Sequence, residues 1–156
     1  FSSIVSAFVP VRFYDFRAAD LHLANLTCAQ ADLSQLQFPD NSLPSLSCMH
    51  VVEHIGLGRY GDPVDPLGDL QAMRELSRVV MPSGSLLVVV PVGAPRVCFN
   101  SHRVYGYEQI IQAFPGLTLV EFSLIPDSKQ QPILLHADPG LVAHQDYACG
   151  CFWFRK

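Results

Sequence analysis

The sequence predicts a single α/β domain over residues 1–156, built on a mostly parallel sheet that is flanked by helices. Three observations lead to this fold class. Short β-like segments alternate with helical segments and turns along the chain. Residues 86–90 form an unbroken run of leucine and valine, which is typical of a strand buried on both faces of a parallel sheet. Hydrophobic residues make up 49% of the chain, so that 156 residues can bury a core.

Apolar residues at helical spacing, together with breaker residues, define the expected helices. The first covers residues 1–8 and is stopped by a proline. The second opens at Asp65, which can cap it, and at Pro66, which suits the first helical position. This helix is expected to end at a turn formed by residues 82–84. A third, short helix is expected over residues 107–114.

Strands are expected where β-branched and aromatic residues gather between turn-forming residues. The expected strands cover residues 11–15, 26–30, 46–52, 86–90, 117–125 and 149–155. Pro44 has no backbone N–H to donate, so the third strand is expected to begin after it. Residues 56–68, which are rich in Gly, Pro and Asp, and residues 126–146 are expected to be loops.

Composition excludes several classes of partner. The net charge is −4 and the ten Lys and Arg residues are scattered singly, so nucleic acid is not an expected partner. Apolar runs stay well short of the roughly 18 residues of a membrane span, so no membrane association is expected. The five cysteines, Cys28, Cys48, Cys98, Cys149 and Cys151, are odd in number and include no Cys-x-x-Cys pair. They are expected to be reduced thiols of a cytoplasmic protein without a bound metal.

Polar residues follow several of the expected strands. In parallel α/β sheets, ligands bind beyond the carboxyl ends of the strands. Asp15, Asp32, residues 50–54 and residues 91–93 occupy such positions, and they are therefore the candidates for a binding site.

Residues 31–33 (ADL), 36–42 (LQFPDNS), 51–55 (VVEHI) and 75–87 (ELSRVVMPSGSLL) resemble class I S-adenosylmethionine-dependent methyltransferases. A longer and more specific string, HIGLGRYGDP at residues 54–63, is similar to a family of uncharacterised methyltransferase-like proteins. The residues PVG at 91–93 and Asn100, His102 and Arg103 belong to the same resemblance. The resemblance runs from about residue 11 to residue 156. It implies a Rossmann-like sheet with an antiparallel C-terminal strand, and S-adenosylmethionine as the cofactor.

The resemblance also implies roles for two acids. Asp15 would hold the ribose hydroxyls of the cofactor, and Asp32 would contact the adenine with Leu33 beside the base. A carboxylate suits the ribose because it accepts two hydroxyl protons at once. The alternative is that both acids only form turns at strand ends.

One part of the methyltransferase pattern is missing. The glycine-rich loop that follows the first strand of these enzymes should precede residues 1–8, and the sequence does not contain it. The first strand is therefore expected to be absent. Either the chain is an N-terminally truncated piece of a longer protein, or the strands at residues 11–15 and 46–52 pair directly.

The catalytic candidates are His50, Glu53 and His54. Either imidazole could act as a general base on an acceptor, since histidine titrates near neutral pH, and Glu53 could orient it. The alternative is a structural histidine, because methyl transfer depends mainly on alignment.

Two further groups of residues are expected to bind a small-molecule or sugar-containing acceptor. They are Arg59, Tyr60 and Asp62 in the long loop, and Asn100, His102 and Arg103 after the fifth strand. The alternative for the loop is that Arg59 and Asp62 pair locally to shape it.

Two other functions remain open alternatives. The chain could be a non-catalytic binding or interaction module with a methyltransferase fold, which the missing glycine loop favours. The His-x-x-Glu-His pattern at residues 50–54 also matches inverted zinc peptidases. Gly56 and Gly58 argue against zinc hydrolysis, because they would end the helix that such a site requires. The acceptor, the methylated atom and the oligomeric state do not follow from the sequence.

Overall fold

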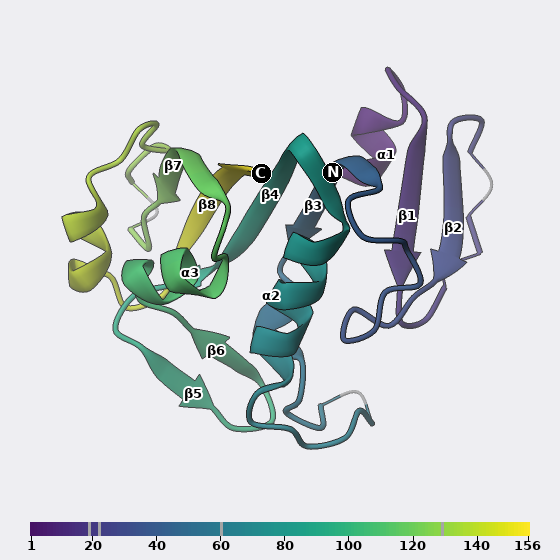
Figure 1. Ribbon diagram of the computed structural model, residues 1–156. Helices are drawn as coiled ribbons and strands as arrows, with labels where there is room; N and C mark the ends of the chain where they lie inside the picture. Colours follow the sequence, from purple (N-terminus) through teal and green to yellow (C-terminus); the bar gives the residue numbers. More distant parts are fainter. Residues whose placement is uncertain (19, 22, 60, 129) are drawn as a thin grey trace. The chain divides into compact units, whose positions relative to one another are not determined.

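The structure is a computed structural model of residues 1–156, which describes every residue except 19, 22, 60 and 129 (Figure 1). The chain divides into two compact units, Phe1–Gln37 and Phe38–Lys156. Each unit is described by itself.

The first unit contains one short helix and two parallel strands. Helix α1 covers Ser2–Val5, and strands β1 (Val11–Asp15) and β2 (Leu26–Gln30) have the predicted bounds. The helix is shorter than predicted, because residues 6–9 continue as turns before the proline at position 10. In the described part of the chain, β1 pairs with β2, so the direct pairing of residues 11–15 with residues 46–52 is not found.

The second unit is built on a four-stranded mixed sheet. Its strands are β3 (Leu43–Met49), β4 (Val80–Val92), β7 (Thr118–Ile125) and β8 (Ala148–Arg155), in the spatial order β3-β4-β8-β7. Strands β3 and β4 are parallel, and β8 runs antiparallel to both of its neighbours. The α/β class, the helices flanking the sheet and the antiparallel C-terminal strand are therefore as predicted.

Two helices cover one face of this sheet, α2 (Gly68–Val79) and α3 (Tyr107–Ala113) (Figure 1). Alternate residues of β4 and β8 supply the core on this face. The core members with almost no exposed surface include Met73, Leu76, Leu86, Val88, Val90, Ile110, Phe114, Phe152 and Phe154. The rings of Phe114, Phe122, Phe152 and Phe154 are in contact, with centroids 4.8 to 6.1 Å apart.

The other face of the sheet is less covered than predicted. Along β4, Leu86, Val88 and Val90 are buried, whereas Leu87 and Val89 between them are only partly buried. The same alternation on β8 leaves Cys149, Cys151 and Trp153 partly exposed. The continuous apolar run at residues 86–90 therefore does not mark a strand that is fully buried on both faces. This difference leaves two cysteine side chains accessible.

Strand β3 differs from the prediction at both ends. It begins at Leu43 instead of after Pro44, and a register shift between Leu43 and Ser45 accommodates the missing N–H of the proline. It ends at Met49 because His50 has a left-handed backbone conformation, with φ 55°. A short 3₁₀ helix, η1 (Val52–His54), then replaces the predicted end of the strand.

Helix α2 begins later than predicted, at Gly68 after the cap residue Leu67. Asp65 does not cap it. Its Oδ1 atom instead accepts a hydrogen bond of 2.9 Å from the Leu67 backbone N–H, which forms a turn before the helix. At the other end, β4 follows α2 directly, and Ser83, with φ 64°, lies within the strand where a turn was predicted.

The remaining elements lie where no helix or strand was predicted. A hairpin of β5 (Arg96–Cys98) and β6 (His102–Val104) precedes α3, and a 3₁₀ helix, η2 (Pro139–His144), precedes β8. Both elements are too short to leave a periodic pattern in the sequence.

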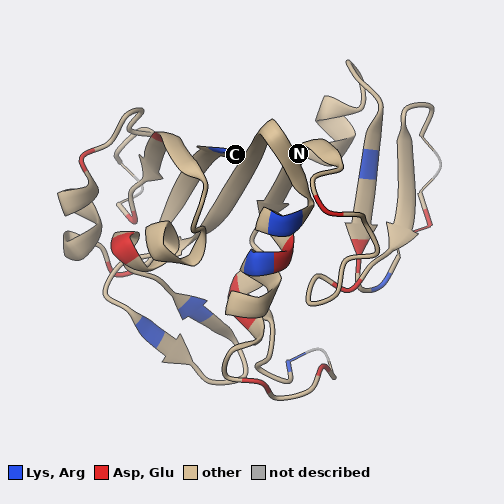
Figure 2. Ribbon diagram, viewed as in Figure 1, with Lys and Arg blue, Asp and Glu red and all other residues tan. Residues whose placement is uncertain are grey.

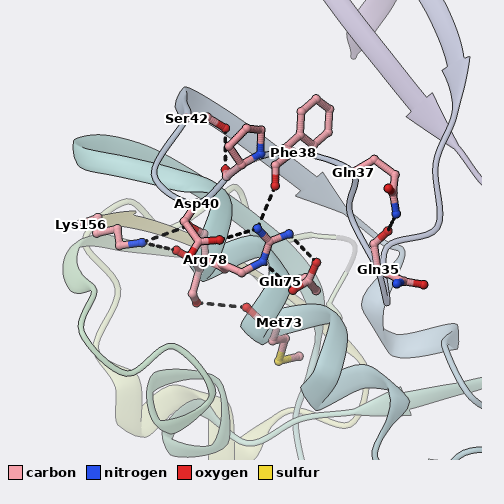
Figure 3. A network of polar contacts seen from close by, with 11 residues as sticks. Gln35, Gln37, Phe38, Asp40, Ser42, Met73, Glu75, Arg78 and Lys156 are labelled. Atoms are coloured by element: carbon pink, nitrogen blue, oxygen red, sulfur yellow. Dashed lines mark hydrogen bonds and ion pairs between the residues drawn. The ribbon is translucent and has the colours of Figure 1, made fainter.

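Arg78, near the end of α2, anchors the segment that enters β3 (Figure 3). Its guanidinium donates to the Phe38 carbonyl (2.8 Å) and to Asp40 Oδ1 (2.7 Å), and it binds both carboxylate oxygens of Glu75. The Nζ atom of Lys156 donates to the Ser77 carbonyl at 2.6 Å. Because the last carbonyls of a helix lack intrahelical partners, these contacts fix both the end of α2 and the start of β3.

Basic residues are spread over several elements rather than gathered on one (Figure 2). None of the helices in the described part of the chain is long and apolar enough to cross a membrane.

Candidate functional site

The predicted catalytic residues lie together where β3 passes into η1. Glu53 is 1% exposed, and its Oε1 atom lies 3.2 Å from His50 Nδ1 and 3.7 Å from His54 Nε2. Its other oxygen, Oε2, is buried and has no hydrogen-bond partner among the described residues. Buried carboxylate oxygens are almost always paired, so this atom marks the cluster as a place where a ligand or a proton could be bound.

The two imidazoles have different environments. The hydrogen bond with Glu53, followed by the charge of the same carboxylate, raises the pKa of His50 above its ordinary value. The Nδ1 atom of His54 lies 2.6 Å from the Ser101 carbonyl oxygen, to which it donates its hydrogen. In neutral His54 the unprotonated nitrogen is therefore Nε2, which faces Glu53.

His102 lies beside this cluster. Its Nδ1 atom is 2.8 Å from the Ser101 hydroxyl, and its ring meets those of His54 and Tyr147 edge-on. Burial lowers the pKa of His102, and the charge of His54 lowers it further. The structure thus brings His50, Glu53, His54 and His102 together.

The long loop is organised by Asp62. Its Oδ2 atom accepts hydrogen bonds from the backbone of Gly56 (2.9 Å) and Gly58 (3.3 Å). Arg59 donates to the Ser101 carbonyl at 3.2 Å, which joins the loop to the His54–His102 region. Both residues therefore shape the loop, whatever they bind. Tyr60 lies outside the described residues.

Arg103 and Asn100 lie differently from His102. Arg103 is buried, its Nε atom lies 3.4 Å from Asp69 Oδ2, and its Nη1 atom donates to the Ile55 carbonyl. Tyr105 donates to the same Asp69 oxygen at 2.9 Å. Asn100 is exposed in the β5–β6 turn, with φ 54°. The structure therefore assigns Arg103 a buried ion pair and Asn100 a turn.

A cavity of about 600 Å³ opens between α2, the β5–β6 hairpin and α3. Arg103 contributes to its lining, together with Arg74 and Arg96. The sequence offered no signal for this cavity, because its lining residues come from separate segments of the chain that only the fold brings together.

The predicted cofactor residues belong to the first unit. Asp15 ends β1 and Asp32 follows β2, so both lie at the carboxyl edge of a parallel pair. Asp15 Oδ1 accepts a hydrogen bond from the Arg17 N–H, and Asp32 Oδ1 accepts from the N–H and hydroxyl of Ser34. Both acids thus form strand-end turns while remaining exposed, and Leu33 is partly buried.

One neighbour of the His50–Glu53 pair was not predicted from the sequence. The Cys149 sulfur on β8 lies 3.5 Å from His50 Nε2. The alternation of β8 was visible in the sequence, but the proximity depends on the pairing of β8 with β4.

The His-x-x-Glu-His pattern does not form the helical arrangement of inverted zinc peptidases. His50 has a left-handed backbone and precedes a 3₁₀ helix of three residues. Across the described part of the chain, no three His, Cys, Asp or Glu side chains are grouped so that they could hold a metal ion.

Comparison with solved structures identifies the fold. The [4+2]-cyclase SpnF matches with a TM-score of 0.57 and 16% identity over 85% of this chain and 57% of its own. The N-methyltransferase NodS from Bradyrhizobium japonicum, in complex with S-adenosyl-L-homocysteine, matches with 0.54 and 18% over 86% and 56%. This chain thus spans little more than half the length of these two proteins.

A SAM-dependent methyltransferase from Methanosarcina mazei matches over 99% of this chain and 85% of its own length, with a TM-score of 0.63 and 11% identity. At such identities the likeness concerns the fold alone. The fold is that of the class I SAM-dependent methyltransferases.

The family assignment is more specific. Residues 32–139, more than two thirds of the chain, match the family described as Caenorhabditis protein of unknown function, DUF268. The chain belongs to this family, which is uncharacterised, as the sequence resemblance implied. No curated protein matches the chain.

Proposed function

We propose that this protein is an S-adenosylmethionine-dependent methyltransferase that acts on a small-molecule or sugar-containing acceptor. The observation that carries the proposal is the His50–Glu53–His54 cluster, with its buried and unpartnered Glu53 oxygen, in a chain with a methyltransferase fold. A fold alone does not define a reaction, so the argument rests on these side chains.

Asp15, Asp32 and Leu33 are the residues that would hold the cofactor. Both carboxylates are exposed at the edge where parallel α/β sheets bind ligands, and their local hydrogen bonds use Oδ1. These carboxylate oxygens are hydrogen-bond acceptors, and they suit ribose hydroxyls and an adenine amino group, which are donors. When bound, S-adenosylmethionine supplies an electrophilic methyl group.

The acceptor side would use the imidazoles. His54 has its Nδ1 hydrogen committed to the Ser101 carbonyl, so Nε2 is the nitrogen that can take a proton from a hydroxyl or amine. Glu53 stabilises the charged imidazole that results, and it holds His50 by its Nδ1 atom. Arg59, Tyr60, Asp62, Asn100, His102 and Arg103 are retained as the proposed acceptor-binding set.

A second candidate function is a methyltransferase fold without methyl transfer. One observation favours it: the solved structure of SpnF, which has this fold, is described as that of a [4+2]-cyclase. The same fold can thus be used for other chemistry, or for binding alone.

The proposed compartment is the cytoplasm. All five cysteines are free thiols in the structure, which is the usual state in a reducing compartment.

The first experiment is a calorimetric titration of the protein with S-adenosylhomocysteine. We expect binding in the micromolar range, and its loss in Asp15→Ala, whereas the control Asp20→Ala, another exposed acid of the first unit, should bind normally. Absence of heat at high protein concentration would exclude cofactor binding by this chain and favour the binding module. If the cofactor binds, candidate acceptors should then be screened for methyl transfer, with His54→Gln as the control variant. Cofactor binding without methyl transfer to any acceptor would likewise favour the binding module over the enzyme.

A further inference from the structure

The His50–Glu53 pair continues into two thiols on strand β8. Glu53 Oε1 binds His50 Nδ1 at 3.2 Å, and His50 Nε2 lies 3.5 Å from the sulfur of Cys149. The thiols of Cys149 and Cys151 are hydrogen-bonded to each other. In the arrangement that activates cysteine nucleophiles, a base contacts the thiol and a third group orients the base. Here Glu53 orients His50, His50 contacts Cys149, and Cys149 links this pair to Cys151 through the hydrogen bond between the two thiols.

The strand positions of the two cysteines explain why they meet. Cys149 and Cys151 alternate with Gly150 on β8, so their side chains emerge on the same face of the sheet. They lie opposite Pro91 and Val89 of β4, whose neighbour β3 leads into His50 (Figure 1). This is the less covered face, and both thiols are partly exposed while half of the His50 side chain is exposed. A small molecule in solution can therefore reach the pair.

The electrostatic environment distinguishes the two thiols. The hydrogen bond that Cys149 donates and, after it, the charge of His50 together lower the pKa of Cys151 from 9.0 to about 7, against the effect of burial. The same hydrogen bond and burial raise the pKa of Cys149. The other charged group acting on Cys149 is Glu53, and Tyr147 lies within electrostatic range. Cys151 is therefore the thiol that ionises, and Cys149 and His50 position it.

We propose that Cys149 and Cys151 form a reactive thiol site for low-molecular-weight disulfides, in which Cys151 is the nucleophile and Cys149, His50 and Glu53 hold it in the reactive state. The Cys151 thiolate attacks one sulfur of the disulfide and forms a mixed disulfide as the S–S bond of the small molecule breaks. The second half of the small molecule leaves as a thiolate, which takes a proton from His50 or water. The protein thiol is oxidised and the small disulfide is reduced to one thiol.

The magnitude of the effect follows from two opposing factors. A pKa about two units lower increases the thiolate fraction near pH 7 about 50-fold, but it decreases the intrinsic nucleophilicity about six- to tenfold. The net expectation is a reaction about fivefold to eightfold faster than that of an ordinary thiol. Cys28 and Cys98, which are also partly exposed, provide thiols for comparison within the same chain.

The test is the reaction of the full chain with oxidised glutathione at pH 7, followed by intact mass and peptide mapping over time. We expect the first glutathione adduct on Cys151, at a rate several-fold above those of Cys28 and Cys98. Cys149→Ala, which removes the hydrogen-bond donor, and His50→Gln should each reduce the Cys151 rate toward that of Cys98. Cys28→Ser should leave it unchanged, and far-UV circular dichroism checks that each variant is folded.

Two results would overturn the proposal. One is equal modification of Cys28, Cys98 and Cys151; the other is fast modification of Cys151 that persists in both His50→Gln and Cys149→Ala. The reaction requires no S-adenosylmethionine, so the outcome is independent of the methyltransferase proposal. A chain that fails to bind S-adenosylhomocysteine can still show the fast thiol, and the reverse also holds.

Discussion

Glu53 is the residue on which the candidate site depends. It is buried, yet it lies between two imidazoles, and one of its oxygens has no partner among the described residues. Little water separates its carboxylate from the two histidines, so the carboxylate acts strongly on them. The pKa of His50 is the quantity that measures this effect most directly.

We predict that Glu53→Gln lowers the pKa of His50, because the carboxylate is the main cause of its elevation. Titration of the imidazole Cε1–H signals by NMR should show His50 charging before His102 in the native protein as the pH falls. In Glu53→Gln the His50 midpoint should move toward 6.5. Glu108→Gln, which changes an exposed acid on α3, should leave it in place.

The same shift has a consequence for stability. A raised folded pKa means that charged His50 stabilises the fold fully below its unfolded pKa of about 6.5, and that this contribution is lost as the pH rises through the folded value. An unchanged titration midpoint of His50 in Glu53→Gln would show that Glu53 does not cause the raised pKa.

Proximity in sequence decided which site residues could be predicted. His50, Glu53 and His54 lie within five positions, so their grouping followed from the end of one strand. Cys149 could not be assigned to them, because its contact with His50 is created by the pairing of β8 with β4. Arg103 was assigned to the acceptor-binding group because of its neighbours in the sequence, yet its side chain forms a buried ion pair with Asp69.

At the level of elements, the loop after η1 is held by backbone contacts that restrict its glycines. Gly56 has φ 77°, donates its N–H to Asp62, and lies so close to the Asp65 carbonyl that a Cβ atom would overlap the oxygen. Gly61 has a similar φ of 84°, but a Cβ atom there would meet no described heavy atom within 4 Å.

We predict that Gly56→Ala destabilises the protein by at least about 1 kcal/mol more than Gly61→Ala, since overpacking adds to the strain. Gly61→Ala should lower the free energy of unfolding only by the cost of an alanine in the left-handed conformation, about 1–2 kcal/mol. Unfolding in guanidinium gives the free energy of unfolding of each variant, and the two values can be compared if the dependence on denaturant concentration is unchanged. Equal losses would mean that the Gly56 loop can move away from Asp65.

The elements themselves differ in how well the sequence predicted them. β1 and β2 match the prediction residue by residue, because turn residues bound them on both sides. β3 and α2 are displaced by two or three residues, since a register shift absorbs Pro44 and Asp65 forms a turn instead of a cap. Pattern alone does not specify such local hydrogen bonds.

At the scale of the whole molecule, the two units differ greatly in their hydrophobic cores. In the described part of Phe1–Gln37, the buried hydrophobic residues are Leu26 and Leu36, whereas Phe1, Ile4 and Phe8 are exposed. The aromatic and aliphatic core described above lies within Phe38–Lys156. Chains below about 40 residues rarely fold without additional cross-links or partners.

We predict that the fragment 38–156 folds alone and that the fragment 1–37 does not. The larger fragment should unfold cooperatively in guanidinium and keep its near-UV circular dichroism, because β3, β4, β8 and β7 are all present. The smaller fragment should show the spectrum of an unfolded chain. A non-cooperative transition in the larger fragment would mean that the second unit depends on the first.

The position of β8 has a consequence for how the protein is made. This strand comes last in the sequence but lies inside the sheet, between β4 and β7. On the ribosome, β7 therefore emerges before β8, the strand with which it pairs among the described residues, and it waits on the order of seconds at ordinary rates of synthesis. During that interval the nascent chain presents unpaired edges on both β4 and β7, and it is then that it most needs a chaperone.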